Sequence, residues 1–128
     1  MNAIKILVVD DETDFRTIIA SVLERAGYDV VTAVDGFEAL EKFATAKPNL
    51  LLLDGHLPDL DGFEVCRRLR STPAGAKVPI ILCTVRSAIS NVSEGLGAGA
   101  TGYLLKPFDP SELLSAVTAA LGVGKKKE

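Results

Sequence analysis

The sequence has few of the features that mark secreted, membrane-spanning or nucleic-acid-binding proteins. Its two cysteines, Cys66 and Cys83, cannot form a disulfide framework, and their apolar contexts predict reduced core residues. No apolar run reaches membrane-spanning length. The first residues, MNAIKILVVDDE, do not resemble a signal peptide. A net charge of only −3 does not indicate a nucleic-acid binder. We therefore expect a cytoplasmic protein that contacts no membrane and no nucleic acid directly.

Internal repeats, low-complexity tracts and linkers are also missing. The 128 residues suit one compact domain with its own core. With 48% hydrophobic and 24% charged residues, the composition is that of an ordinary globular protein. We expect a single domain over residues 1–121, followed by a short basic tail over 122–128.

Short aliphatic runs alternate with longer runs that have helical spacing. Thr13 is expected to cap the first helix and Gly27 to end it. Unbroken apolar strands that alternate with helices predict an α/β fold, a parallel sheet with helices on both faces. The right-handed crossover rule favours a flavodoxin-like, doubly wound, five-stranded sheet of order 2-1-3-4-5. The expected strands are 4–9, 28–33, 50–53, 79–83 and 102–105, and the expected helices are 13–26, 35–46, 62–70, 87–96 and 111–121.

Reactive side chains follow four of the five expected strands. Asp10 and Asp11 come after the first, Asp54 after the third, Thr84 after the fourth and Lys106 after the fifth. In a doubly wound sheet the carboxyl ends of the strands share one edge, and ligands bind there. We therefore expect carboxylates, a hydroxyl and an amine to converge in one crevice.

The excess of negative charge at this edge predicts a divalent metal. Carboxylates at Asp10, Asp11 and Asp54 cannot all stay ionised side by side without compensation, and Lys106 supplies only one positive charge. Carboxylates, a backbone carbonyl and waters suit Mg²⁺. A carboxylate beside a metal and an ammonium group suits phosphoryl transfer, in which Asp54 attacks in line and Thr84 donates a hydrogen bond to the acyl phosphate.

Each of these residues also has a purely structural explanation. Asp10 and Asp11 could cap a helix and complement its dipole, and Asp54 could cap a turn. Thr84 could cap the next helix, and Lys106 could be an ordinary surface lysine. Their joint placement at one sheet edge favours a functional site.

The sequence resembles the receiver domain of bacterial two-component response regulators. We expect a stand-alone receiver of the CheY-like kind. The resemblance covers essentially the whole chain, and its motifs are specific when they occur together in this order. The matching segments are ILVVDDE (6–12), LLLLDGHLPDLDG (50–62), PIILCT (79–84) and GAGATGYLLKPF (97–108).

The resemblance implies a magnesium site and a phosphorylation site. Asp54 would accept the phosphoryl group and also contact the metal. Asp11 would bind Mg²⁺ directly, Asp10 would act largely through water, and the backbone carbonyl of His56 would complete the protein's share of the shell. Lys106 would bind the phosphoryl oxygens.

The resemblance also implies a switch and a set of partners. Thr84 would move toward the phosphate, and Tyr103 would rotate inward. The phosphoryl donor would be a phosphohistidine on a sensor histidine kinase or a histidine phosphotransfer protein, and the activated form would bind an unidentified downstream protein. Such a domain promotes its own phosphorylation and dephosphorylation but turns over no separate substrate, so we do not expect an enzyme.

Three residues around the site are expected to tune it. Val85 follows Thr84 where the family usually has Ala or Gly, so its bulk could narrow access to Asp54. His56, two residues after Asp54, has either an unremarkable exposed side chain or a role in phosphate lifetime. Arg86, which follows Val85, is the third residue that we expect to tune the site.

Two other functions remain open from the sequence. A receiver that is never phosphorylated would serve as an interaction scaffold, which Val85 favours and the intact acids, Thr84 and Lys106 oppose. A haloacid-dehalogenase-like phosphatase would need an Asp two residues after its nucleophile, where this chain has His56. A nucleotide-binding enzyme is disfavoured because neither a P-loop nor GxGxxG follows the first strand.

The expected output surface, formed by the fourth helix, fifth strand and fifth helix, carries few charged residues. Glu94, Arg86 and Glu112 are its main charges, and the fifth helix otherwise offers small residues. A dimer held by many ion pairs would need more basic residues than this. We therefore expect a monomer that binds a different protein on this face.

Overall fold

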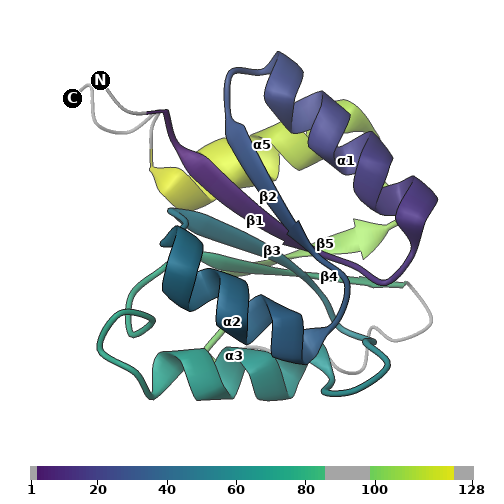
Figure 1. Ribbon diagram of the computed structural model, residues 1–128. Helices are drawn as coiled ribbons and strands as arrows, with labels where there is room; N and C mark the ends of the chain where they lie inside the picture. The colour runs from purple at the N-terminus through teal and green to yellow at the C-terminus, as the bar shows by residue number, and fades with distance from the viewer. Residues whose placement is uncertain (1–2, 86–98, 123–128) are drawn as a thin grey trace.

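A five-stranded parallel sheet forms the centre of the molecule in the computed structural model, which describes residues 3–85 and 99–122 (Figure 1). The strand order is β2-β1-β3-β4-β5, and every pairing is parallel. The predicted flavodoxin-like order 2-1-3-4-5 is therefore confirmed. The strands are β1 (Lys5–Val9), β2 (Asp29–Ala33), β3 (Leu50–Asp54), β4 (Ile80–Val85) and β5 (Gly102–Lys106).

Helices cover both faces of this sheet, as the sequence pattern predicts. Figure 1 shows α1 and α5 on one face and α2 and α3 on the other. Their bounds are α1 (Thr13–Arg25), α2 (Gly36–Ala46), α3 (Gly62–Arg70) and α5 (Pro110–Leu121). The expected helix over 87–96 lies outside the described residues. None of the helices that the structure describes is long and apolar enough to cross a membrane.

The central strand β3 divides its side chains between two cores. Successive strand side chains point to opposite faces, so Leu51 and Leu53 pack with residues of α2 and α3. Leu50 and Leu52 pack with residues of α1 and α5. All four leucines are buried. This double burial explains why the strand reads as a continuous apolar run instead of an alternating one.

Two details at the carboxyl ends of the strands differ from the sequence-based expectation. Asp54, Thr84 and Lys106 belong to the last residues of their strands instead of following them. Thr13 does not cap α1. Glu12 holds the N-cap position without a side-chain cap bond, and the carboxylate of Asp10 accepts the Glu12 N–H at 2.9 Å. Asp10 therefore binds the backbone just before the helix, and the described contacts of α1 include no side-chain cap.

The loop between β3 and α3 is fastened to its surroundings at two points. The Asp59 carboxylate accepts the backbone N–H groups of Gly36 (2.7 Å) and Phe37 (2.9 Å) at the start of α2. At the other end of the loop, a Cβ on Gly62 would lie 2.3 Å from the carbonyl oxygen of Asp54. Only glycine fits such a close approach. The loop after Asp54 is thus held against both α2 and β3.

Candidate functional site

Lys106 reaches from the edge strand β5 to the middle of the sheet. Its Nζ lies 3.0 Å from Oδ2 of Asp10, beyond the end of β1, and 3.6 Å from Oδ2 of Asp54, the last residue of β3. Burial opposes the lysine's charge, but the hydrogen bond to Asp10 and the charge on Asp54 outweigh it, so the pKa of Lys106 is raised. Lys106 is therefore a fixed cation between two carboxylates.

Asp54 is a buried carboxylate with incomplete compensation. It is only 8% exposed, and burial is the main reason that its pKa is raised. Lys106 and the His56 N–H, which lies 3.2 Å from Oδ1, lower the pKa, while Asp10 and Asp11 raise it. The surroundings thus destabilise the ionised form of Asp54, and a further positive charge nearby would stabilise it.

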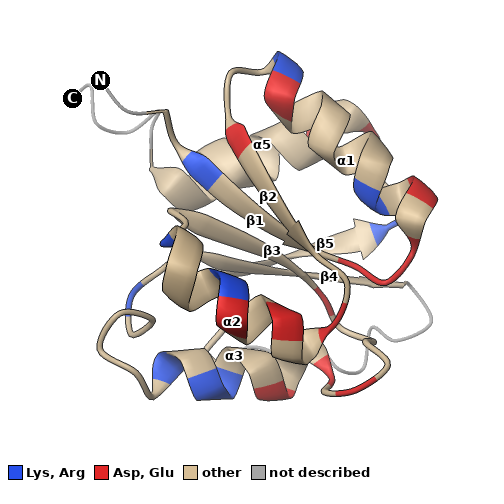
Figure 2. Ribbon diagram, viewed as in Figure 1, with Lys and Arg blue, Asp and Glu red and all other residues tan. Residues whose placement is uncertain are grey.

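Three carboxylates lie close enough to share one cation. Asp10, Asp11 and Asp54 each offer an oxygen atom, and these atoms lie within 4.8 Å of one another. Asp10 and Asp54 are buried while Asp11 is exposed, so the cluster has one open side. Oxygen ligands with room for water suit Mg²⁺. Figure 2 shows red, acidic positions near the carboxyl ends of the strands and a blue, basic position at the end of β5.

Thr84 and Val85 end β4 beside the acids. Thr84 is 3% exposed and follows Cys83, the residue paired with Asp54 across the two strands. Val85 is paired with Lys106 and is 39% exposed. Burial raises the pKa of Cys83 to about 12, so its thiol stays protonated beside the carboxylates.

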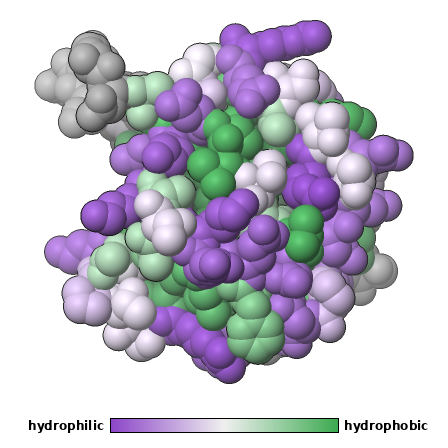
Figure 3. All heavy atoms as spheres, in the orientation of Figure 1, coloured by the Kyte–Doolittle hydropathy of each residue, from purple (hydrophilic) through white to green (hydrophobic). Residues whose placement is uncertain are grey.

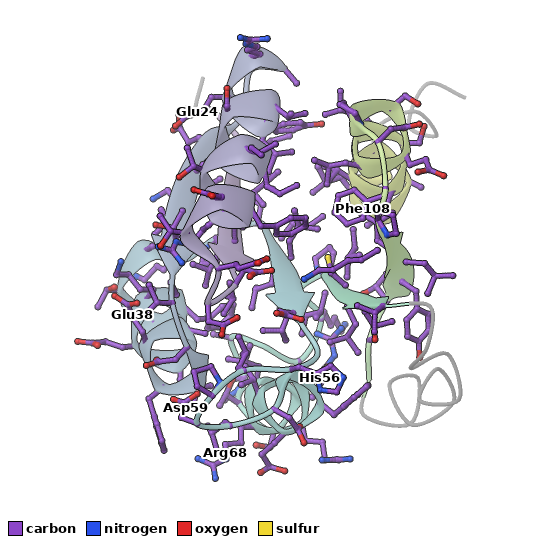
Figure 4. The ribbon with its side chains drawn as sticks, turned by 90° about the vertical axis from the view of Figure 1, so that its right-hand side faces the viewer. Glu24, Glu38, His56, Asp59, Arg68 and Phe108 are labelled. Carbon is purple, nitrogen blue, oxygen red and sulfur yellow. The ribbon has the colours of Figure 1, made fainter. Side chains whose placement is uncertain are left out.

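The remaining predicted site residues touch the cluster only through backbone, lie farther from it, or fall outside the described chain. His56 lies in the β3–α3 loop, contacts Asp54 through its backbone N–H and has an exposed side chain (Figure 4). Tyr103 lies in β5 opposite Leu82 and packs, partly buried, against the core on the α2–α3 face. Arg86 and Glu94 belong to the segment that the structure does not describe.

An aromatic pair beside Lys106 was not identified as part of the site from sequence. The Phe15 ring lies under the ammonium group, with 4.4 Å between its centroid and Nζ. Phe108, labelled in Figure 4, meets Phe15 edge to face at 5.6 Å. Helical spacing marked Phe15 only as an inward-facing residue of α1. The contact between Phe15 and Lys106, which lie far apart in the sequence, cannot be inferred from a single sequence.

A surface hollow lies away from the acids, between the carboxyl-terminal halves of α2 and α3. It has a volume of about 540 Å³, and its apolar walls include Leu40, Phe43 and Leu69. Figure 3 shows apolar side chains in this region. The chemistry instead belongs to the carboxyl edge, where the charged groups converge.

Comparison with known proteins places the chain in a family. Residues 6–118 match the model of the response regulator receiver domain. The chain therefore belongs to the receiver domains of two-component response regulators, as its sequence motifs predict.

Relatives with known names agree with this assignment. The chain is 48% identical to the alkaline phosphatase synthesis transcriptional regulatory protein PhoP of Bacillus subtilis, over 91% of this chain and 48% of that protein. It thus spans about half the length of this curated relative. The chemotaxis response regulator CheY4 of Vibrio cholerae superimposes with a TM-score of 0.88 and 35% identity, over 93% of this chain and 99% of the other.

A third relative bears on the metal. The receiver domain of the sensor histidine kinase PA1611 from Pseudomonas aeruginosa has a TM-score of 0.87 and 32% identity, over 94% of this chain and 99% of that one. Its structure contains a magnesium ion coordinated in the active-site cleft. A magnesium site is thus known in this family, and the three carboxylates of this chain provide suitable ligands.

The raised pKa of Asp54 predicts a variant that is more stable than the wild type. A folded-state pKa above 3.8 means that the folded protein holds this proton more tightly than the unfolded chain does, so ionisation of Asp54 costs stability as pH rises. Without metal at pH 7, Asp54→Asn should raise the free energy of unfolding by about 1 kcal/mol. The gain should shrink as pH falls toward 3.8.

Urea unfolding in the presence of a chelator measures this difference. Asp29→Asn is a matched control because Asp29 is an exposed carboxylate in β2, and it should change stability little. An Asp54→Asn variant less stable than the wild type would show that the attraction of Lys106 outweighs burial.

Proposed function

We propose that this receiver is a phosphorylation-dependent signalling switch whose acceptor is Asp54. The observation that carries the proposal is the position of the Asp54 carboxylate, 3.6 Å from the Lys106 ammonium and within one metal-sized cluster with Asp10 and Asp11. The donor is a phosphohistidine on a sensor histidine kinase or histidine phosphotransfer protein. An Asp54 oxygen attacks phosphorus, the P–N bond breaks, and the imidazole leaves.

The residues around Asp54 have different roles toward the phosphoryl group and the metal. Lys106 binds the phosphoryl oxygens, and the buried Thr84 near the end of β4 donates a hydrogen bond from its hydroxyl to one of them. Asp10, Asp11, Asp54 and the backbone carbonyl of His56 are the candidate ligands of Mg²⁺, which would add positive charge against the phosphoryl oxygens. The chain promotes its own phosphorylation and dephosphorylation and turns over no separate substrate.

The proposed output begins with Thr84 and Tyr103. Thr84 lies in the strand next to β5, and Tyr103 pairs with Leu82, two residues before Thr84. A shift of Thr84 toward the phosphoryl group leaves room for Tyr103 to move inward. The result is a changed surface at β5 and α5, where a downstream protein binds. The described part of this surface has a hollow of about 250 Å³ beside Tyr103 and Ala116.

Asp54→Asn should abolish phosphorylation, because an amide oxygen lacks the negative charge needed for attack on phosphorus. Incubation with acetyl phosphate and Mg²⁺, followed by intact-mass measurement, should show one phosphoryl group on the wild type and none on the variant.

Asp11→Ala should weaken Mg²⁺ binding in isothermal titration, whereas Asp29→Asn should match the wild type in both assays. A wild type without an adduct would indicate a scaffold, and sustained hydrolysis of phosphate esters would indicate a phosphatase.

Val85→Ala should speed phosphorylation by acetyl phosphate several-fold. The valine is the last residue of β4, is paired with Lys106 across the sheet and is 39% exposed. Removing two methyl groups widens access to Asp54 without changing a charge. Stopped-flow or quenched-flow rates would measure the effect, with Val34→Ala as a control at a similarly exposed valine after β2. Equal rates for Val85→Ala and wild type would remove Val85 as a gate.

The protein should remain a monomer on activation. In the described part of the output surface, α5 carries one acid in its first turn and no basic residue in its last turn, so few partners exist for an ion-paired dimer. Light scattering after size exclusion, with and without beryllium fluoride and Mg²⁺, measures this directly. A tight dimer only in the activated sample would contradict the proposed heterologous output.

A further inference from the structure

The ammonium group of Lys106 has an apolar neighbour on its third side. Two sides face Asp10 and Asp54, at 3.0 and 3.6 Å, and the Phe15 ring lies 4.4 Å away on another. An aromatic face carries partial negative charge, so it attracts a cation held over it. The lysine is thus surrounded by three groups that all favour its positive charge.

Phe15 is itself held in a defined orientation. It lies in the first turn of α1, directly after the acids of the β1–α1 connection, and Phe108 meets its ring edge to face with 75° between the ring planes. Phe108 follows Lys106 by only two residues. The ring is therefore held by the same two segments that carry Asp10 and Lys106.

Little water reaches the ammonium group of Lys106. The lysine side chain is only 17% exposed. The packing around the Phe15 ring is also tight, since the void beside it has a volume of only about 10 Å³, with Asp10, Ile19 and Phe108 among its walls. Because few waters compete for the ammonium group, its attraction to the ring is stronger than at an exposed surface.

We propose that Phe15 is a positioning residue for Lys106. A free lysine side chain has four rotatable bonds and loses freedom when it binds a phosphoryl oxygen. The ring removes part of this freedom beforehand, because it holds Nζ beside the Asp54 carboxylate. Lys106 then needs only to exchange its contact with Asp10 for one with the phosphoryl group. This inference rests on the proposed function of Asp54.

Ordinary core packing is the competing explanation for Phe15. The ring is partly buried and contacts the core on the α1–α5 face, so a smaller residue would also loosen packing there. Packing alone would be satisfied by any apolar side chain of similar size. Positioning requires an aromatic face and depends on the presence of Lys106, and these two requirements separate the explanations.

The test compares substitutions at position 15 in two backgrounds. Binding of beryllium fluoride with Mg²⁺, followed by isothermal titration, serves as an equilibrium mimic of the phosphoryl group. Phe15→Leu should weaken binding about fivefold, which corresponds to about 1 kcal/mol, and Phe15→Met should behave alike. Phe15→Tyr keeps the ring face and should bind within about twofold of the wild type. In a Lys106→Met background, Phe15→Leu should cause no further loss.

Controls separate this inference from packing and from the proposed function. Phe43→Leu removes a ring from the core on the opposite face of the sheet and should leave beryllium fluoride affinity unchanged. Equal affinity of wild type and both Phe15→Leu and Phe15→Met would overturn the inference, as would an equal loss in the Lys106→Met background. A wild type that takes no phosphoryl group from acetyl phosphate would instead contradict the proposed function of Asp54.

Discussion

The site depends on one ion pair that crosses the sheet. Lys106 belongs to the edge strand β5 and pairs with Asp10, which follows the inner strand β1, with β3 and β4 between the two strands. Without this cation, the buried carboxylates of Asp10 and Asp54 would repel each other in a poorly solvated place. Breaking a buried pair of this kind costs about 3–5 kcal/mol, because one charge is left uncompensated. The contact therefore secures the site and connects the edge of the sheet to its middle.

One cation for three carboxylates leaves the site short of positive charge, and this shortage connects stability with function. The raised pKa of Asp54 shows that its ionised form is held at a cost. A divalent metal would relieve that cost, and the proposed phosphorylation would place the new negative charge beside Lys106 and the candidate metal ligands. A fully neutralised site would be more stable but would bind Mg²⁺ less well. Under the proposed function, the receiver thus gives up some stability for its acceptor chemistry, as functional sites commonly do.

The sequence predicted the topology well because the information is local and repeated. The run of four leucines over 50–53 in β3 has no polar position, which favoured a strand buried on both faces, and the crossover rule favoured the order of the sheet. The same logic brought residues from the ends of four strands to one edge. It wrongly placed Thr13 at the N-cap, which Glu12 holds, and it could not predict that the Asp10 carboxylate would accept the Glu12 N–H, because such local side-chain to backbone bonds leave no clear sequence signal. Nor could it predict the Phe15–Lys106 contact, which depends on side-chain directions in α1 and β5.

The β1–α1 connection and the first residues of α1 carry both the negative charge of the site and a group that stabilises the lysine. Asp10 and Asp11 carry the negative charge, and Phe15 contacts Lys106, the lysine that partly compensates this charge. Arg16, the next residue, donates to the backbone carbonyl of Asp10 at 2.7 Å, which holds the start of the connection against α1. The helix therefore fixes the spacing between the acids and the aromatic ring. Any movement of α1 relative to β1 would change the positions of the candidate metal ligands and of the lysine together, so the phosphoryl transfer proposed for Asp54 would require this connection to be rigid.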